Sequence, residues 1–305
     1  MPPQPAVDTA RPDEHGEALR LLFRDIPESE RDKRITTALE LLRTGELDPD
    51  GLFVERSEIG LAGVLICLPV PGASALFWPP RSIADSDSEG REDRMLATAL
   101  SWVRSRGAKL SQSLLATEEV PLAASLLRNG FRHVTRLWYL AADLTRPVPN
   151  PLSSIGLKFQ TYSPENAALL HSTLLRTYEG TLDCPEISGV RTVDEIIAGH
   201  RAQGRFDPSR WWLISEGARP IGVVLMTEMP QTGDWDVAYL GIVPEARRRG
   251  VARELMNRAM TDAKLWGAHR LTLSVDGRNL PALQLYRDLE FVPYDRREVY
   301  LAIWR

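Results

Sequence analysis

The sequence predicts an α/β fold that is built twice along one chain. Its 305 residues are too many for a single domain of roughly 150 residues. Strand-like and helical segments follow the same order in both halves. Four punctuating residues of the first half recur at a constant separation of 160 positions: Gly90 and Gly250, Gly107 and Gly267, Pro121 and Pro281, and Phe131 and Phe291. A tandem duplication explains all four pairs.

The first half begins with a Pro-rich stretch, residues 1–12, which we expect to be a loose tail. Helical patterns follow, and then three strand-like segments. A helix with apolar residues at helical spacing ends near Gly107. The predicted helices are 14–24, 30–43, 95–103 and 121–129, and the predicted strands are 52–55, 61–68, 73–78, 110–115 and 137–142.

Residues 146–154 separate the halves, because three prolines in this stretch resist both helix and sheet. We therefore predict domains at 1–145 and 157–305, joined by a linker at 146–156. The second half restarts with a strand at 157–162. It then shows a helix opened by Ser163-Pro164-Glu165, a second helix opened by a capping box at 192–195, and a hairpin of strands 211–215 and 221–228.

The next stretch, residues 235–253, carries the clearest chemical signal. Apolar and β-branched residues from Trp235 to Val243 predict a buried strand that stops at Pro244. Three arginines then precede Gly250, where a helix begins. A glycine-containing turn at a helix N-terminus offers unpaired backbone N–H groups to an anion, and the arginines add positive charge. The sequence therefore predicts a phosphate-binding loop.

Two motifs in residues 235–291 resemble those of the GNAT superfamily of acyl-CoA-dependent N-acetyltransferases. One is R-x-x-G-x-A over residues 247–252, directly after the buried strand. The other is N-x-x-A-x-x-L-Y over residues 279–286, followed by Glu290-Phe291 where the family usually has Gly-Phe. The resemblance implies two tandem GNAT-like domains, each a mixed, mostly antiparallel sheet flanked by helices. It also matches two-domain members of the superfamily.

The resemblance implies acetyl-CoA as the co-substrate, with no metal. The loop amides would hold its diphosphate, and the strand end would pair with its pantetheine arm and polarise the thioester carbonyl. The cofactor-binding residues implied are Leu240, Gly241, Ile242, Arg247, Arg248, Arg249, Gly250, Val251, Ala252, Arg253, Asn279 and Tyr286. Asn279 is also the expected cap of the following helix.

Catalysis by direct attack needs a base for the amine, since an alkyl amine is mostly protonated at pH 7. Asp236 matches the position of an acidic base in several family members, Glu228 is the second candidate, and Tyr239 is the third. Tyr286 matches the general acid that protonates the departing thiolate. The alternatives are a strand-start Asp236 meeting solvent and a Tyr286 that belongs to the core.

In the family, the segment that corresponds to residues 177–186 covers the acceptor. Glu179, Asp183 and Glu186 carry charges that suit a cationic amine, and we take Glu179 and Asp183 as the substrate-binding candidates. Surface carboxylates are also common without any ligand. Cys184 has no base beside it in the sequence, so we expect a structural role.

The first half lacks these features. At the positions of Arg247–Ala252 it has Asp87-Ser-Glu-Gly-Arg-Glu92, so the charge of the loop is inverted, and Leu126 replaces Tyr286. Two like charges a few ångströms apart repel by about 1 to 4 kcal/mol near a surface. We therefore expect the first domain to be degenerate.

Composition narrows the partners and the compartment. A net charge of −4 and a pI near 5.8 argue against nucleic acid, including the charged transfer RNA of tandem aminoacyl transferases. Two cysteines and no long apolar segment lead us to expect a cytoplasmic protein without a membrane partner. The expected function is acetyl or short-acyl transfer to a primary amine of a small molecule or peptide. The alternative is a non-catalytic acyl-CoA-binding or regulatory protein, and the oligomeric state stays open.

Overall fold

The computed structural model describes residues 6–58, 60–148 and 156–304. They divide into two compact units, unit 1 with residues 1–134 and 298–305 and unit 2 with residues 135–297. Most of the predicted linker, residues 149–155, lies outside the described part. Among the described residues, no helix combines the length and the apolar character needed to cross a bilayer.

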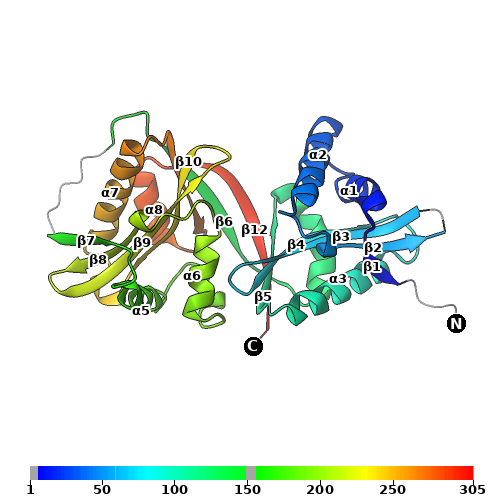
Figure 1. The fold of residues 1–305 in the computed structure, drawn as a ribbon, viewed down its shortest axis with the longest axis horizontal. Helices are drawn as coiled ribbons and strands as arrows, with labels where there is room; N and C mark the ends of the chain where they lie inside the picture. Colours follow the sequence, from blue (N-terminus) through cyan, green and yellow to red (C-terminus); the bar gives the residue numbers. More distant parts are fainter. Residues whose placement is uncertain (1–5, 59, 149–155, 305) are drawn as a thin grey trace. The chain divides into compact units, whose positions relative to one another are not determined.

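Unit 1 is a mixed sheet between two pairs of helices (Figure 1). Its strands lie in the order β1 (Val7–Thr9), β2 (Leu52–Ser57), β3 (Gly60–Val70), β4 (Ser74–Ser82), β5 (Leu110–Leu115) and the end of β12 (Val292–Ile303). Its helices are α1 (His15–Leu22), α2 (Glu28–Thr44), α3 (Ser88–Ser105) and α4 (Ala123–Arg128). The prediction that residues 1–12 form a loose tail is corrected in part. Residues 7–9 of this stretch form β1, which pairs with β2.

Unit 2 repeats this plan. Its sheet order is β6 (Arg132–Asp143), β11 (Arg270–Asp276), β10 (Asp234–Ile242), β9 (Arg219–Met229), β8 (Trp211–Glu216) and β7 (Leu157–Thr161). Helices α7 (Val251–Leu265) and α8 (Leu280–Asp288) pack on one face, and α5 (Ala167–Thr177) and α6 (Val193–Arg201) pack on the other. Only β10 and β11 run parallel among these neighbours. The predicted fold class is confirmed.

The duplication is visible in the element bounds. Strand β4 spans 74–82 and β10 spans 234–242, so both ends differ by 160. Strands β6 (132–143) and β12 (292–303) differ by the same number at both ends. Each half of the sequence thus repeats one strand and helix order.

The two compact units differ from the predicted domains because each contains one strand that the sequence assigned to the other domain. Strand β6 precedes the predicted linker, yet it pairs with β11 in unit 2 over residues 137–143. The end of β12 pairs with β5 in unit 1, from Glu298 opposite Leu115 to Ile303 opposite Leu110. Each unit is therefore completed by a strand from the other half of the sequence.

Candidate active site

Strands β10 and β11 diverge soon after they begin to pair. Their parallel register holds only at Trp235 opposite Leu271 and Asp236 opposite Thr272. One extra residue of β10 then shifts its register with β9, between Val237 and Tyr239. Beyond this bulge, the described strands leave the β11 side of β10 unpaired. The end of β10, Leu240 to Ile242, lies on this open edge, where the sequence predicted contacts with pantetheine.

The turn between β10 and α7 presents a run of free amides. Gly250 caps α7 in the left-handed conformation, with φ of 82°, and Arg248 is left-handed as well, with φ of 61°. The first amides with acceptors in the helix are those of Arg253 and Glu254, which both donate to the Gly250 carbonyl. Within the described chain, the N–H groups of residues 248–252 have no hydrogen-bond acceptor. Five adjacent donors at the positive end of a 15-residue helix suit a diphosphate.

The arginine side chains of this turn have different partners. The Arg247 guanidinium donates to four backbone carbonyls at 2.7–3.2 Å, those of Thr177, Glu179, Gly180 and Ile242. It therefore fastens the end of α5 to the end of β10. Arg249 pairs with Glu216 and Arg253 with Asp288, both at 2.6 Å and largely in solvent. Arg248 has no such partner among the described residues.

Gly241 is required by close packing. A Cβ atom built there would lie 2.5 Å from both the Thr177 Oγ1 and the Tyr239 hydroxyl. Thr177 donates its proton to the Leu174 carbonyl at 2.6 Å, so the Tyr239 hydroxyl must donate to Thr177 at 2.7 Å. Burial raises the pKa of Tyr239 further above its usual value. Tyr239, the third candidate for the base, is thus a neutral donor that holds β10 against α5.

Asp236 lies at the point of divergence. Its Oδ1 accepts a 2.6 Å hydrogen bond from Thr272 on β11. Burial raises the pKa of Asp236 to about 6, and the Thr272 bond opposes this shift in part. A carboxylate that titrates near 6 is ionised at neutral pH and still able to accept a proton, which is the property of a general base.

Two tyrosines that the sequence did not single out face the same carboxylate. Tyr139 on β6 and Tyr294 on β12 stack edge to face, with ring centroids 6.2 Å apart. Burial is the main cause of the raised pKa of both, and the Asp236 charge adds to it. Strand periodicity alone could not find them, because aromatic residues on strands are common in any core.

Glu228 is not brought together with Asp236. The register places Glu228 opposite Trp235, whose ring belongs to the core beneath α7, while Asp236 is opposite Thr227. Since neighbouring residues of a strand point to opposite faces, the two carboxylates point apart. Glu228 instead pairs with Arg205 at 3.3 Å. Its proposed role as a base stays a prediction without geometric support.

Tyr286 lies on α8, 8% exposed, with its ring 5.7 Å from that of Phe291. Burial and the nearby Asp183 charge raise its pKa, so the phenol stays protonated at neutral pH. The two expected roles, core residue and acid, are compatible in this place. Asn279 accepts a hydrogen bond from the Ala282 amide at 3.3 Å and caps α8.

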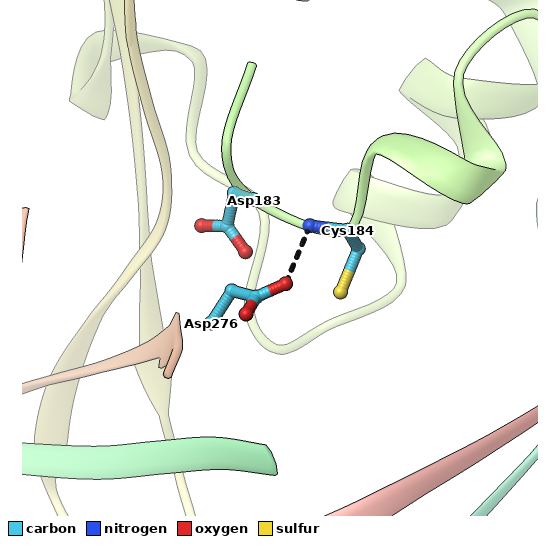
Figure 2. A group of neighbouring side chains, drawn as sticks. All are labelled: Asp183, Cys184 and Asp276. Carbon is cyan, nitrogen blue, oxygen red and sulfur yellow. Dashed lines mark hydrogen bonds between the residues drawn. The ribbon is translucent and has the colours of Figure 1, made fainter. Parts of the chain in front are cut away.

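Asp183 stands in the loop between α5 and α6. Its carboxylate lies near that of Asp276 at the end of β11, and the ligand atoms of Asp183, Cys184 and Asp276 are all within 4.8 Å of one another (Figure 2). Its charge also reaches Tyr239 and Tyr286. Asp183 therefore lies near the end of β11, and its role as a substrate-binding residue stays a prediction. The side chain of Asp183 is exposed, yet desolvation by the protein around it and the negative charge of Asp276 raise its pKa to about 6.

The other acidic candidate, Glu179, has an exposed side chain and takes part through its backbone carbonyl, which Arg247 binds. Cys184 is half-buried, and burial together with the surrounding carboxylates raises the pKa of its thiol. A thiol in that environment stays protonated, which agrees with the structural role expected for it.

The corresponding turn of unit 1 is closed by its own side chains. Helix α3 begins at Ser88, so residues 88–92, expected as part of a loop, are its first turns, and Gly90 is inside the helix. The Arg94 guanidinium binds Asp87 at 2.7 Å and the buried Glu55 at 2.7 Å. Arg91 binds Asp85 at 2.8 Å. Arginines and carboxylates thus neutralise one another where unit 2 has open amides.

Comparison with known proteins agrees with this geometry. Residues 175–291 match the model of the Acetyltransferase (GNAT) family. The C-terminal copy is thus similar in sequence to the GNAT family. This segment holds the open amides, the diverging strands and Asp236, Tyr286 and Asp183.

A relative named "Mycothiol acetyltransferase" from Beutenbergia cavernae is 29% identical over 234 residues, covering 67% of this chain and 74% of that protein. Further relatives of this name are covered over smaller parts of their length, for example 61% of the one from Thermobispora bispora. The likeness expected to two-domain members of the GNAT superfamily is confirmed. The family match and these relatives identify the chain as an N-acetyltransferase.

Solved structures confirm the tandem GNAT fold. A GCN5-related N-acetyltransferase from Sphaerobacter thermophilus superposes with a TM-score of 0.65 at 18% identity, covering 99% of this chain and 96% of that one. A tandem GNAT protein from the clavulanic acid biosynthesis pathway gives 0.52 at 15% identity, covering 98% of each chain.

Proposed function

We propose that unit 2 transfers an acetyl or other short acyl group from coenzyme A to the primary amine of a small molecule or peptide. The run of five unpaired amides at residues 248–252 carries this proposal, because it places adjacent backbone donors at the positive end of α7, where a diphosphate can accept from them. The unpaired edge of β10 supports it further, since the pantetheine arm contains amides that can pair with backbone.

In the proposed reaction, Asp236 takes a proton from the ammonium group of the acceptor, directly or through water. The neutral nitrogen attacks the thioester carbonyl carbon, and an amide of the open β10 edge stabilises the oxyanion. The carbon–sulfur bond then breaks as the carbonyl re-forms, and the nitrogen, which gained a positive charge on attack, releases its extra proton to water. The thiolate of coenzyme A receives a proton from Tyr286, which is protonated at neutral pH, and the resulting phenolate regains a proton from water.

The acceptor is proposed to meet Asp183, with Glu179 at the rim of the same loop. An ionised Asp183 favours a cationic amine over a neutral or acidic acceptor. Because its relatives are named mycothiol acetyltransferases, the deacetylated form of mycothiol is the first acceptor to test. A panel of smaller primary amines tests whether the site needs that scaffold.

The decisive experiment follows the acetylated product by mass spectrometry, with acetyl-CoA and this panel, from pH 5 to 9. We expect turnover that falls below about pH 6, where Asp236 becomes protonated. Asp236→Asn should lower kcat by about 10² to 10⁴-fold. The matched variant Glu228→Gln should keep wild-type kcat, because its carboxylate points away from Asp236.

The opposite result for these two variants would transfer the role of base to Glu228. Binding of acetyl-CoA without turnover of any amine, at any pH in this range, would favour the alternative of a non-catalytic acyl-CoA-binding protein.

A further inference from the structure

The buried carboxylate of Asp276, at the end of β11, is the contact point of three segments of unit 2. Asp276 is 0% exposed. One oxygen accepts from the Thr135 hydroxyl on β6 at 2.5 Å and from the Arg278 amide at 2.8 Å. The other accepts from the Cys184 amide at 3.0 Å, which belongs to the loop between α5 and α6 (Figure 2). Burial of a charge is costly unless it is hydrogen-bonded in this way.

Arg278 extends the contact toward the solvent. Its guanidinium binds Asp276 at 2.7 Å and, through two nitrogens, both oxygens of Glu186 at 2.6 and 3.0 Å. Glu186 lies three residues beyond Asp183 in the same loop. The segment 183–186 is therefore held to the end of β11 at both of its ends.

The backbone N–H of Asp276 also lies close enough to the Asp183 carboxylate to lower its pKa. Cys184 adopts a left-handed conformation, with φ of 41°, which is unfavourable for a residue other than glycine. The Cys184 amide bond to Asp276 offsets that strain.

We propose that Asp276 is a positioning residue, whose buried carboxylate, with Arg278 and Glu186, fixes the loop so that Asp183 faces the acceptor amine beside Tyr286. This inference rests on the proposed function. It goes beyond it by naming the group that holds the acceptor loop. It also explains why a buried Asp stands at a strand end where no ligand contact is assigned to it.

The charged groups around Asp183 determine how its pKa should change in a variant of Asp276. The neighbours that face it are Asp276 and Arg278 after β11, Cys184 and Glu186 in its own loop, Tyr178 after α5, Tyr239 on β10 and Tyr286 on α8. Asp276 raises the pKa of Asp183 and Arg278 lowers it. Asp276→Asn removes the repulsion between the two carboxylates and keeps the backbone of residue 276, so it lowers the pKa of Asp183.

The first measurement needs no substrate. Carboxyl ¹³C NMR of aspartate-labelled full-length protein, with the Asp183 signal assigned by its loss in Asp183→Asn, follows the titration of that group alone. We expect a midpoint near pH 6 in the wild type and a lower one in Asp276→Asn. Hydrogen exchange of residues 183–187 should be faster in Asp276→Asn and, to a smaller extent, in Glu186→Gln, which changes only a partly exposed side chain.

The kinetic arm uses acetyl-CoA and the best amine of the panel. Asp276→Asn should raise the acceptor KM about 10- to 100-fold, the effect of losing one charged hydrogen bond, with the Kd for acetyl-CoA unchanged. Asp262→Asn is the matched control. It also removes a nearly buried, Arg-paired carboxylate, but on α7, and should leave the acceptor KM and the Asp183 titration unchanged.

An unchanged Asp183 titration and unchanged loop exchange in folded Asp276→Asn and Glu186→Gln would overturn the inference, whatever the activity. If Asp276→Asn does not fold, Glu186→Gln tests the inference by itself. Wild-type hydrogen exchange of residues 183–187 in that variant would show that the contact between Arg278 and Glu186 does not hold the loop in place. A protein with the expected NMR and exchange changes but no turnover would instead overturn the proposed function.

Discussion

At the scale of single residues, the surroundings of each group in unit 2 keep two carboxylates ionised and one phenol protonated at the same pH. Asp236 and Asp183 both have pKa values raised to about 6, so they are mostly ionised at neutral pH. Tyr286, more buried and near the Asp183 charge, has a pKa raised above that of an ordinary phenol. A base and an acid can thus act in one site at one pH.

Tyr286→Phe tests the donor. The change removes one hydroxyl and little volume, so if Tyr286 protonates the thiolate, kcat should fall about 10² to 10⁴-fold while acetyl-CoA affinity stays constant. Stopped-flow measurement of the acyl-transfer step avoids a limit from product release. Tyr300→Phe is a suitable control, because Tyr300 is also buried, at 5% exposure, but lies in unit 1. Wild-type rates for Tyr286→Phe would show that Tyr286 is a core residue and not the proton donor.

The sequence could single out Asp236 and Tyr286 as candidates because each lies at a fixed distance from a recognisable motif, and Asp183 because it lies in the segment that covers the acceptor in the family. The roles of Arg247 and Asp276 could not be predicted in this way. Their partners are backbone groups far along the chain, such as the Glu179 carbonyl 68 residues before Arg247. An arginine in a basic turn has the same sequence signature whether it binds a ligand or a carbonyl.

At the scale of elements, the turn between β10 and α7 combines two left-handed residues with the start of a long helix. The left-handed Gly250 turns the chain so that α7 begins without a side-chain cap, which leaves its first amides open. The same position in unit 1 is inside α3 and carries no such conformation. A glycine at this position is therefore not sufficient to leave the first amides of the helix open. The residues before it determine where the helix starts.

Gly250→Asp should abolish detectable acetyl-CoA binding by calorimetry, because it places a negative side chain where a diphosphate must approach backbone. The substitution also strains the backbone by about 1–2 kcal/mol. Gly267→Asp controls for that strain, since Gly267 follows the other end of α7 with φ of 88° and open space around its Cα. Equal acetyl-CoA affinity for wild type and folded Gly250→Asp would remove the turn from the binding site.

At the scale of the whole chain, the two copies share a fold and differ in the turn that the proposed function uses. Strand, helix and linker signals with their 160-residue period predicted the tandem architecture correctly. The exchange of β6 and β12 could not be predicted. Edge strands of two similar sheets carry similar alternating patterns, so the sequence does not say which sheet each strand completes.

We expect one molecule of acetyl-CoA per chain, bound to unit 2. In unit 1, Arg94 and Glu55 close the corresponding turn together with Asp87, and Leu126 replaces the proton donor. Calorimetry should give a stoichiometry of one, and the double variant Asp87→Ala/Glu89→Ala should bind acetyl-CoA with wild-type affinity. A stoichiometry of two, or coenzyme A density beside Gly90 in a soaked crystal, would show that both copies bind.

The exchanged strands also set an order of events during synthesis. Strand β5 of unit 1 pairs with β4 on one side and gains its second neighbour only when residues 298–303 emerge from the ribosome, after the other strands of unit 2. At about 5–20 residues per second, the first half waits on the order of ten seconds or more with an exposed sheet edge. Such an edge can pair with other nascent chains. A gene cut at the predicted linker would make this transient state permanent, so the two copies were duplicated as a sequence but must mature as one molecule.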